Sequence, residues 1–195
     1  MSTKYRMIRS AAAAVGLFAL LVFLPGCPFS PDDDPGPPVT GVPERNSVTG
    51  AVALYAYAWT NQRYDIYELL LHPDFEYFPQ SEDLIDFPWL QGQISWVRTD
   101  ELQMARNMFD DNFQPADPTA GTVDTIDMQL TIDGQNPDPQ GGGTIVDVRA
   151  VATVMYKTAG SGARSDVRFQ FLVVPDTDED GLFQIKEQRE LPPYQ

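Results

Sequence analysis

The stretch SVTGAVALYAYAWTNQRYDIYELLLHPDFEYF, residues 47–78, predicts two helices followed by a strand. Apolar residues recur in its first half at steps of three and four: Val48, Val52, Tyr55 and Trp59. This period indicates a helix with one face packed on a core. Ser47 lies at the N-cap position, where its hydroxyl can accept a hydrogen bond from an amide of the first turn. The opposite side is apolar too, so we expect this helix to be covered on most sides.

A second, shorter helix is predicted from Tyr64 to Leu71, after a break at residues 61–63. Its expected inward side chains are Ile66, Leu69 and Leu70. His72-Pro73 ends it, because the residue before a proline is pushed out of the helical region. A strand over residues 75–78 follows. Helices, a strand, another helix and then a run of strands indicate an α+β fold.

The segment 79–96 reads as irregular, and its expected apolar anchors are Trp89, Ile94 and Trp96. Thr99 is then expected to cap a helix that ends near residue 112. Asp100 and Glu101 lie in the first turn of this helix, where negative charge suits the helix dipole.

Four strands are predicted in the last third of the chain, where apolar and polar residues alternate. They cover residues 126–132, 146–156 and 167–173, and a stretch that starts near Phe183. Their connections are short, so successive strands should be antiparallel neighbours.

The N-terminus has the pattern of a bacterial lipoprotein signal peptide. Three basic residues precede an apolar run, residues 11–24, that is too short to span a bilayer comfortably. The run ends in Leu24-Pro25-Gly26-Cys27, which resembles a lipobox, with Pro25 in place of the usual small residue. We expect residues 1–26 to be removed and Cys27 to carry acyl chains that anchor the protein to the membrane of the cell envelope, on the outer membrane or periplasmic face. The alternative is an ordinary signal peptide with an incidental cysteine.

Residues 27–46 form an acidic, proline-rich tether, and residues 47–195 have the length of one ordinary domain. The chain has 13 Lys+Arg against 28 Asp+Glu, and removing residues 1–26 takes away three of the basic residues, which leaves 10 − 28 = −18. Such an acidic surface argues against nucleic-acid binding and against electrostatic adhesion to anionic lipid.

Two groups of residues resemble the NTF2-like superfamily, which includes SnoaL-like domains. They are the run from Tyr64 through His72-Pro73-Asp74-Phe75-Glu76-Tyr77, and Trp96-Val97-Arg98-Thr99-Asp100-Glu101 at the start of the third helix. The closing Gly181-Leu182-Phe183-Gln184-Ile185 is also similar. The resemblance implies an α+β cone-shaped fold, with N-terminal helices packed in a curved antiparallel sheet.

The family includes isomerases, dehydratases and members without enzymatic activity. An isomerase-like member would use Tyr57 as a donor and a carboxylate base near Pro79, where the nearest acids in sequence, Glu76 and Glu82, are both out of register. Glu76 would then serve as a displaced base. Dehydratase-like members use histidine, and the single His72 follows a helix and precedes a proline, where a surface or capping role is the commoner one. One histidine and one cysteine leave no Ser-His-Asp or Cys-His arrangement.

A concave pocket for a small apolar ligand is one expectation for the mouth of the cone. The candidate pocket residues are Tyr57, Tyr77, Trp89, Trp96 and Phe109. Aromatic rings at helix and strand period are also typical of a plain core, and this interpretation stays open.

Residues 176–187 match the pattern of an EF-hand calcium loop, with ligands at Asp176, Asp178, Asp180 and Glu187. The flanking sequences favour strands where an EF-hand needs helices, so a solvated hairpin turn is the favoured interpretation. We therefore expect no metal and no cofactor, and the calcium site remains a hypothesis.

Taken together, the sequence predicts an envelope lipoprotein with a non-enzymatic NTF2-like domain. The domain would bind a small apolar ligand or another envelope protein, and a homodimer through the exposed sheet face is an option. The alternative is an enzyme of isomerase or dehydratase type.

Overall fold

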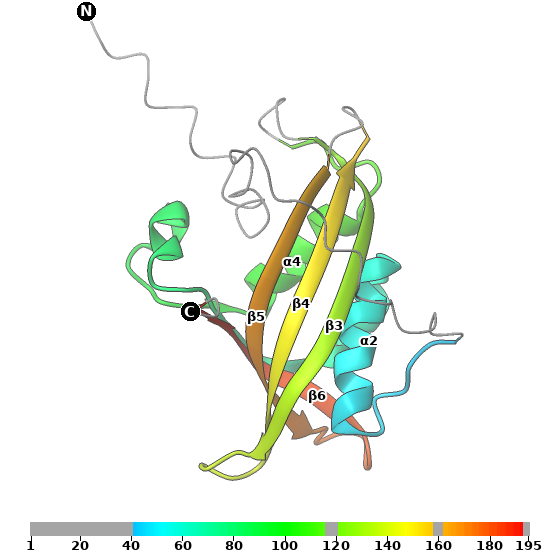
Figure 1. Cartoon of the computed structure of the whole chain (residues 1–195), viewed down its shortest axis with the longest axis vertical. Coiled ribbons are helices and arrows are strands. Elements are labelled where there is room, and N and C mark those ends of the chain that lie inside the picture. The colour runs from blue at the N-terminus through cyan, green and yellow to red at the C-terminus, as the bar shows by residue number, and fades with distance from the viewer. Residues whose placement is uncertain (1–40, 116–120, 158–161, 193–195) are drawn as a thin grey trace, which may run out of the picture.

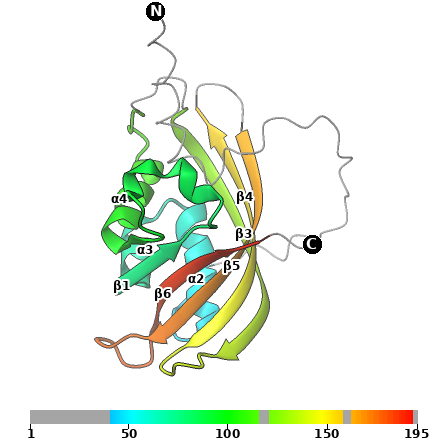
Figure 2. The same cartoon turned by 90° about the vertical axis from the view of Figure 1, so that its left-hand side faces the viewer.

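The computed structural model describes residues 41–115, 121–157 and 162–192. The expected signal peptide, the expected lipidation site Cys27 and most of the expected tether lie outside these residues. The described part has three helices and one six-stranded sheet, and the helices lie on the concave side of the curved sheet (Figures 1 and 2). Among the described helices, none combines the length and apolar character that crossing a membrane requires.

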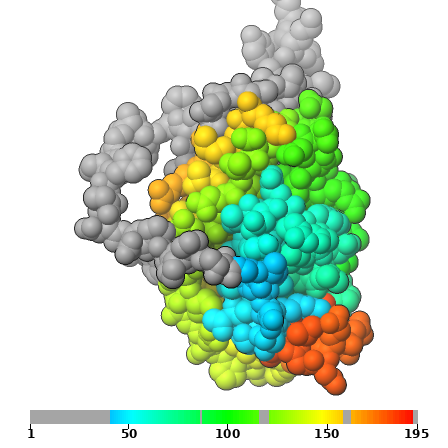
Figure 3. All heavy atoms as spheres, turned by 90° about the vertical axis from the view of Figure 1, so that its right-hand side faces the viewer, coloured from blue at the N-terminus to red at the C-terminus, as the bar shows by residue number. Residues whose placement is uncertain are grey.

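Helix α2 (Val48–Thr60) packs on the core through the face that the sequence predicts. Val52, Tyr55 and Trp59 are buried, and Ser47 Oγ accepts a hydrogen bond from the Gly50 amide at 3.0 Å. The helix ends where Gln62 takes a left-handed conformation, with φ of 50°. Figure 3 shows that one side of α2 remains at the molecular surface.

Helix α3 (Tyr64–Leu70) presents Tyr67 and Leu70 to the core. The prediction that Leu69 points inward is wrong, since this side chain is 60% exposed. Tyr67 and Leu70 are one helical turn apart, whereas Leu69 lies two residues from Tyr67 and so on the opposite side. Strand β1 (Leu71–Phe78) begins earlier than predicted, because Leu71 pairs with Ile185 of strand β6 (Phe183–Leu191).

The sheet has the strand order β2-β1-β6-β5-β4-β3. The remaining strands are β2 (Trp96–Val97), β3 (Val123–Pro137), β4 (Thr144–Tyr156) and β5 (Gly162–Pro175). The four predicted strands are confirmed as the antiparallel neighbours β3 to β6. Strand β1 runs parallel to β6, so the sheet is mixed rather than wholly antiparallel.

Two features differ from expectation between β1 and the end of helix α4 (Arg98–Phe109). Val97 is the N-cap residue of α4, without a side-chain cap, and Thr99 lies inside the helix. Before it come two short 3₁₀ turns, η1 (Asp83–Asp86) and η2 (Pro88–Leu90). Phe87 and Leu90 anchor these turns, whereas Trp89 and Ile94 are 48% and 65% exposed, so their prediction as anchors is wrong. A 3₁₀ turn brings residues three apart onto one side, which is the spacing of Phe87 and Leu90.

The end of α2 also protects the exposed edge of the sheet. Thr60 Oγ1 accepts a hydrogen bond from the Met128 amide at 3.0 Å and donates to the Met128 carbonyl at 3.3 Å. Both backbone groups belong to the edge strand β3, where unpaired groups would otherwise face solvent or a second chain.

Candidate functional site

A buried carboxylate, Glu101, lies at the centre of the polar groups enclosed between helices and sheet. Glu101 is only 1% exposed to solvent. The Tyr67 hydroxyl donates to Glu101 Oε1 at 2.6 Å, and Trp96 Nε1 donates to Oε2 at 2.7 Å. Both oxygens therefore have a donor from the protein, and the three side chains come from α4, α3 and β2. A buried charge is tolerated when it is hydrogen-bonded in this way.

The corner between β2 and α4 places Glu101. Trp96 belongs to the edge strand β2 and pairs with Tyr77 of β1. Glu101 follows five residues later, in the first turn of α4. Arg98 holds the corner in place, because its guanidinium donates to the Leu71 carbonyl at 3.2 Å and to the Glu68 carbonyl at 2.7 Å. The residues of this motif thus have structural partners within the domain.

Two further tyrosines of the interior pair with residues of β6. The Tyr55 hydroxyl lies 3.1 Å from Gln188 Oε1, and the Tyr77 hydroxyl lies 3.2 Å from Glu190 Oε2. Trp59 Nε1 is the buried side-chain polar atom among the described residues that has no hydrogen-bond partner. Its indole makes T-shaped contacts with the Tyr67 and Phe109 rings, with centroids 5.5 and 5.1 Å apart.

Burial sets the protonation of these groups. It raises the pKa of Glu101 above the ordinary value of 4.5, while the hydrogen bonds from Tyr67 and Trp96 act in the opposite direction. Burial likewise raises the pKa of Glu190, and the charge of Asp83 adds to this effect. The pKa values of Tyr55, Tyr67 and Tyr77 are raised, first by burial and then by neighbouring carboxylates, so these hydroxyls stay protonated donors near neutral pH.

No family model matches the chain, and neither does any curated protein. Solved structures do resemble it. A conserved protein from Planctomyces limnophilus aligns at a TM-score of 0.55 with 8% identity, covering 75% of this chain and 94% of the other. A candidate scytalone dehydratase from Novosphingobium aromaticivorans aligns at 0.52 with 10% identity, over 73% and 79%. An NTF2-like superfamily protein from Salmonella enterica aligns at 0.48 with 10% identity, over 76% and 89%.

This domain has the NTF2-like fold. The two alignments with the higher TM-scores agree with the curved sheet and enclosed helices described above, and they confirm the resemblance seen in the sequence. Identities of 8% and 10% carry the fold and nothing finer about the activity of the NTF2-like domain.

The five predicted pocket residues lie in four different environments of the domain. Tyr77 and Trp96 are buried and stacked, with ring centroids 4.1 Å apart and planes 13° apart. Trp89 lies at the surface, and its ring centroid is 5.7 Å from that of the buried Trp96. Phe109 contacts the deeper Trp59 and Tyr67. Tyr57 is half-buried and lies two residues from Tyr55 on α2, which places it on another side of the helix.

The isomerase-type pair of Tyr57 and Glu76 is not brought together. Glu76 alternates with the inward Tyr77 on β1, so it faces the outer side of the sheet. There it lines an open surface groove of about 470 Å³ next to the start of α4. Charges of both signs line this groove: Asp74, Glu76, Arg98 and Lys186.

Asp176 makes the side-chain contacts that organise the acidic turn. Asp176 Oδ1 accepts the amides of Asp178 and Glu179 at 2.8 and 3.3 Å, and Oδ2 accepts from Arg45. Glu187 lies on β6, where it pairs with Arg189 at 2.8 Å. Across residues 41–115, 121–157 and 162–192, no three His, Cys, Asp or Glu side chains gather closely enough to hold a metal ion.

Sequence reasoning missed Glu101 and Tyr67 as the centre of the interior network. The sequence explains Glu101 by its favourable interaction with the helix dipole in the first turn, and that explanation says nothing about burial. The signal in the sequence that could have indicated this contact is the spacing of five residues between Trp96 and Glu101. It brings an indole donor and a carboxylate together at the start of α4.

The stability of the domain should depend on pH through Glu101. Its folded pKa is raised above the unfolded value, so its contribution is fully present below the unfolded pKa and is lost as pH rises through the folded pKa. We expect the free energy of unfolding of the wild type to fall, relative to Glu101→Gln, as pH rises from about 4 to about 8. Urea denaturation at each pH measures this difference, and parallel profiles for the two proteins would contradict it.

Proposed function

We propose that this protein is an envelope lipoprotein whose NTF2-like domain binds another envelope protein and performs no reaction of its own. The observation that carries the proposal is the filled interior. The Tyr77 and Trp96 rings are stacked at 4.1 Å, which leaves no space between them for a ligand. The interior carboxylate Glu101 has both oxygens occupied by protein donors. A binding role through the outer surface is therefore favoured over a small apolar ligand held inside the cone.

The lipobox-like run before Cys27 supports attachment to the envelope. Acyl chains on this cysteine would contribute about 0.8 kcal/mol per buried CH₂ and would hold the protein without a basic surface. This arrangement suits a processed chain of formal net charge −18, which anionic lipid repels.

One observation favours an enzyme of isomerase or dehydratase type as a second candidate. Glu101 is a buried carboxyl with a raised pKa that contacts a tyrosine hydroxyl, as an acid or base at a reacting centre would. In this candidate function the interior would have to open, so that a substrate replaces Tyr67 or Trp96 as a partner of Glu101.

Native mass spectrometry of the full chain, extracted from its own envelope without denaturation, tests the proposal. We expect a second protein at fixed stoichiometry and no bound small molecule. The matched control is Cys27→Ala, which should lose the membrane attachment and, with it, those proteins that depend on the anchor. A stoichiometric small molecule in the wild-type complex would overturn the proposal and support a ligand-binding or enzymatic cone.

A further inference from the structure

Exposed apolar side chains gather in one short segment of the domain, residues 83–97, which we call the 83–97 segment. Seven large apolar side chains of the described residues are exposed, and four of them belong to this segment. They are Ile85 at 83%, Trp89 at 48%, Ile94 at 65% and Val97 at 49%. Single exposed apolar residues are ordinary on a protein surface, but four of them within one short segment indicate a binding surface.

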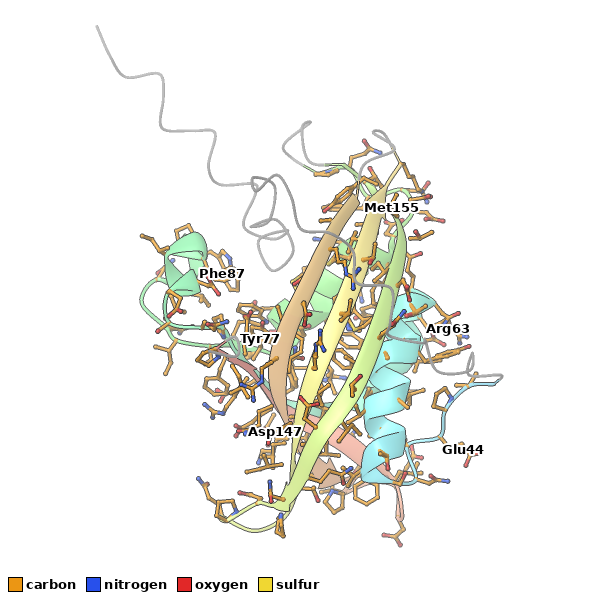
Figure 4. The ribbon with its side chains drawn as sticks, viewed as in Figure 1. Glu44, Arg63, Tyr77, Phe87, Asp147 and Met155 are labelled. Atoms are coloured by element: carbon orange, nitrogen blue, oxygen red, sulfur yellow. The ribbon has the colours of Figure 1, made fainter. Side chains whose placement is uncertain are left out.

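Two buried side chains of the 83–97 segment, Phe87 and Leu90, anchor it to the core. Phe87 and Leu90 are 6% and 4% exposed, and the Phe87 ring contacts Trp96 at 5.2 Å in a T-shaped geometry. Figures 1 and 4 show the turns around Phe87 standing out from the side of the sheet. The exposed side chains are thus presented by turns that the core holds in place, which lowers the entropic cost of binding.

The charge of the segment is of one sign. Between Pro79 and Val97 the sequence has three acidic residues and no lysine or arginine. The next basic residue in sequence, Arg98, donates to the Leu71 and Glu68 carbonyls, and Lys186 of β6 lines the groove beside Val97 at the end of the segment. Glu82 is exposed beside the apolar side chains, and Asp100 is exposed just after them.

We infer that the 83–97 segment docks a protein segment that combines apolar side chains with lysine or arginine. This inference rests on the proposed protein-binding function and names the chemistry of the partner. Apolar anchors would be buried against Ile85, Trp89 and Ile94, and a cationic rim would meet the carboxylates. A second copy of this chain would bring the same acidic residues face to face, and an anionic bilayer would be repelled in the same way.

The test uses the full chain and two synthetic helical peptides of about 12 residues with the same leucines, one with lysines and one with glutamates at the remaining positions. Fluorescence anisotropy of the labelled peptides measures binding. We expect the glutamate peptide to bind at least about tenfold more weakly. The uncharged triple change Ile85→Ser, Trp89→Ser, Ile94→Ser should weaken the lysine peptide about tenfold or more. The control Leu69→Ser, Met155→Ser removes exposed apolar groups elsewhere and should stay within about twofold.

Lysine-peptide binding that survives the triple change would reflect the overall negative charge alone and would overturn the inference. So would equal binding of both peptides. Two further results would also overturn the inference. Cosedimentation with phosphatidylethanolamine–phosphatidylglycerol vesicles that the triple change abolishes would identify lipid as the occupant. A dimer in analytical ultracentrifugation that the triple change abolishes would identify a second copy of this chain. A partner that persists in native mass spectra while the peptide test fails would leave the proposed function standing and remove only this docking surface.

Discussion

Replacing Glu101 by alanine is expected to lower the free energy of unfolding by about 3–5 kcal/mol. The change removes the acceptor of two buried donors, the Tyr67 hydroxyl at 2.6 Å and Trp96 Nε1 at 2.7 Å. Each unsatisfied buried polar group costs about 1–3 kcal/mol, and the cavity left in a closed interior adds to this cost. Urea denaturation of the full chain at neutral pH, followed by far-UV circular dichroism, measures the loss.

Glu101→Gln is the matched control for this change. Its amide keeps the shape of the side chain and one acceptor for Trp96, so we expect a loss of only about 1 kcal/mol. Tyr67→Phe should fall between the two variants, because it leaves Glu101 with one donor. If Glu101→Ala cost less than about 1 kcal/mol, water would already reach this carboxylate. The interior would then be open, and the enzyme candidate would gain support over the binding module.

The helix and strand periods of the sequence predict most of the fold, because each reports a one-sided burial that the structure keeps. Val52, Tyr55 and Trp59 form the inner face of α2, and the alternation in residues 146–156 is the alternation of β4. The error at Leu69 has the same origin. A seven-residue helix has too few turns for its period to define a face, and tertiary contacts choose Tyr67 instead.

Contacts between distant residues explain what the sequence does not reveal. Strand β1 begins at Leu71 only because Ile185, more than a hundred residues later, supplies a partner. The burial of Glu101 depends in the same way on Tyr67 of another helix. The exposure of Trp89 follows from the packing of Phe87 and Leu90, since all three residues look equally apolar in the sequence.

Replacing Asp176 by alanine is the other change expected to be strongly destabilising, by about 2–4 kcal/mol. The carboxylate side chain is 4% exposed, and it binds the amides of Asp178 and Glu179 together with the Arg45 guanidinium. Its loss leaves the two amides without their acceptor, and it leaves the largely buried Arg45 with only the Glu179 carboxylate at 3.3 Å and the Phe183 carbonyl at 3.5 Å. The Arg45 carbonyl also accepts from the Phe183 amide at 2.8 Å, so the chain just before α2 is fastened to the β5–β6 turn.

Asp166→Ala gives the matched comparison, because Asp166 and Arg149 pair at 2.7 Å with side chains that are 50% and 43% exposed. An exposed pair of this kind is worth at most about 1 kcal/mol. Arg45 holds the pKa of Asp176 below its usual range, so the stability it gives is present above the unfolded pKa and is lost as pH falls. Denaturation curves for Asp176→Ala and Asp166→Ala measure the difference. At neutral pH Asp176→Ala should lose more stability than Asp166→Ala, and its loss should become smaller at acidic pH.

A double-mutant cycle with Arg45→Met and Asp176→Ala should show a coupling of about 1–3 kcal/mol. If the turn were a calcium loop, calcium should stabilise Arg45→Met. Removing Arg45 would free Asp176 Oδ2 to bind the ion, and the bound ion would restore stability. We expect millimolar calcium to leave the stability of Arg45→Met unchanged, because Asp176 Oδ1 remains bound to two amides and Glu187 stays with Arg189 on β6. The turn then serves to fix the chain just before α2 against the start of β6.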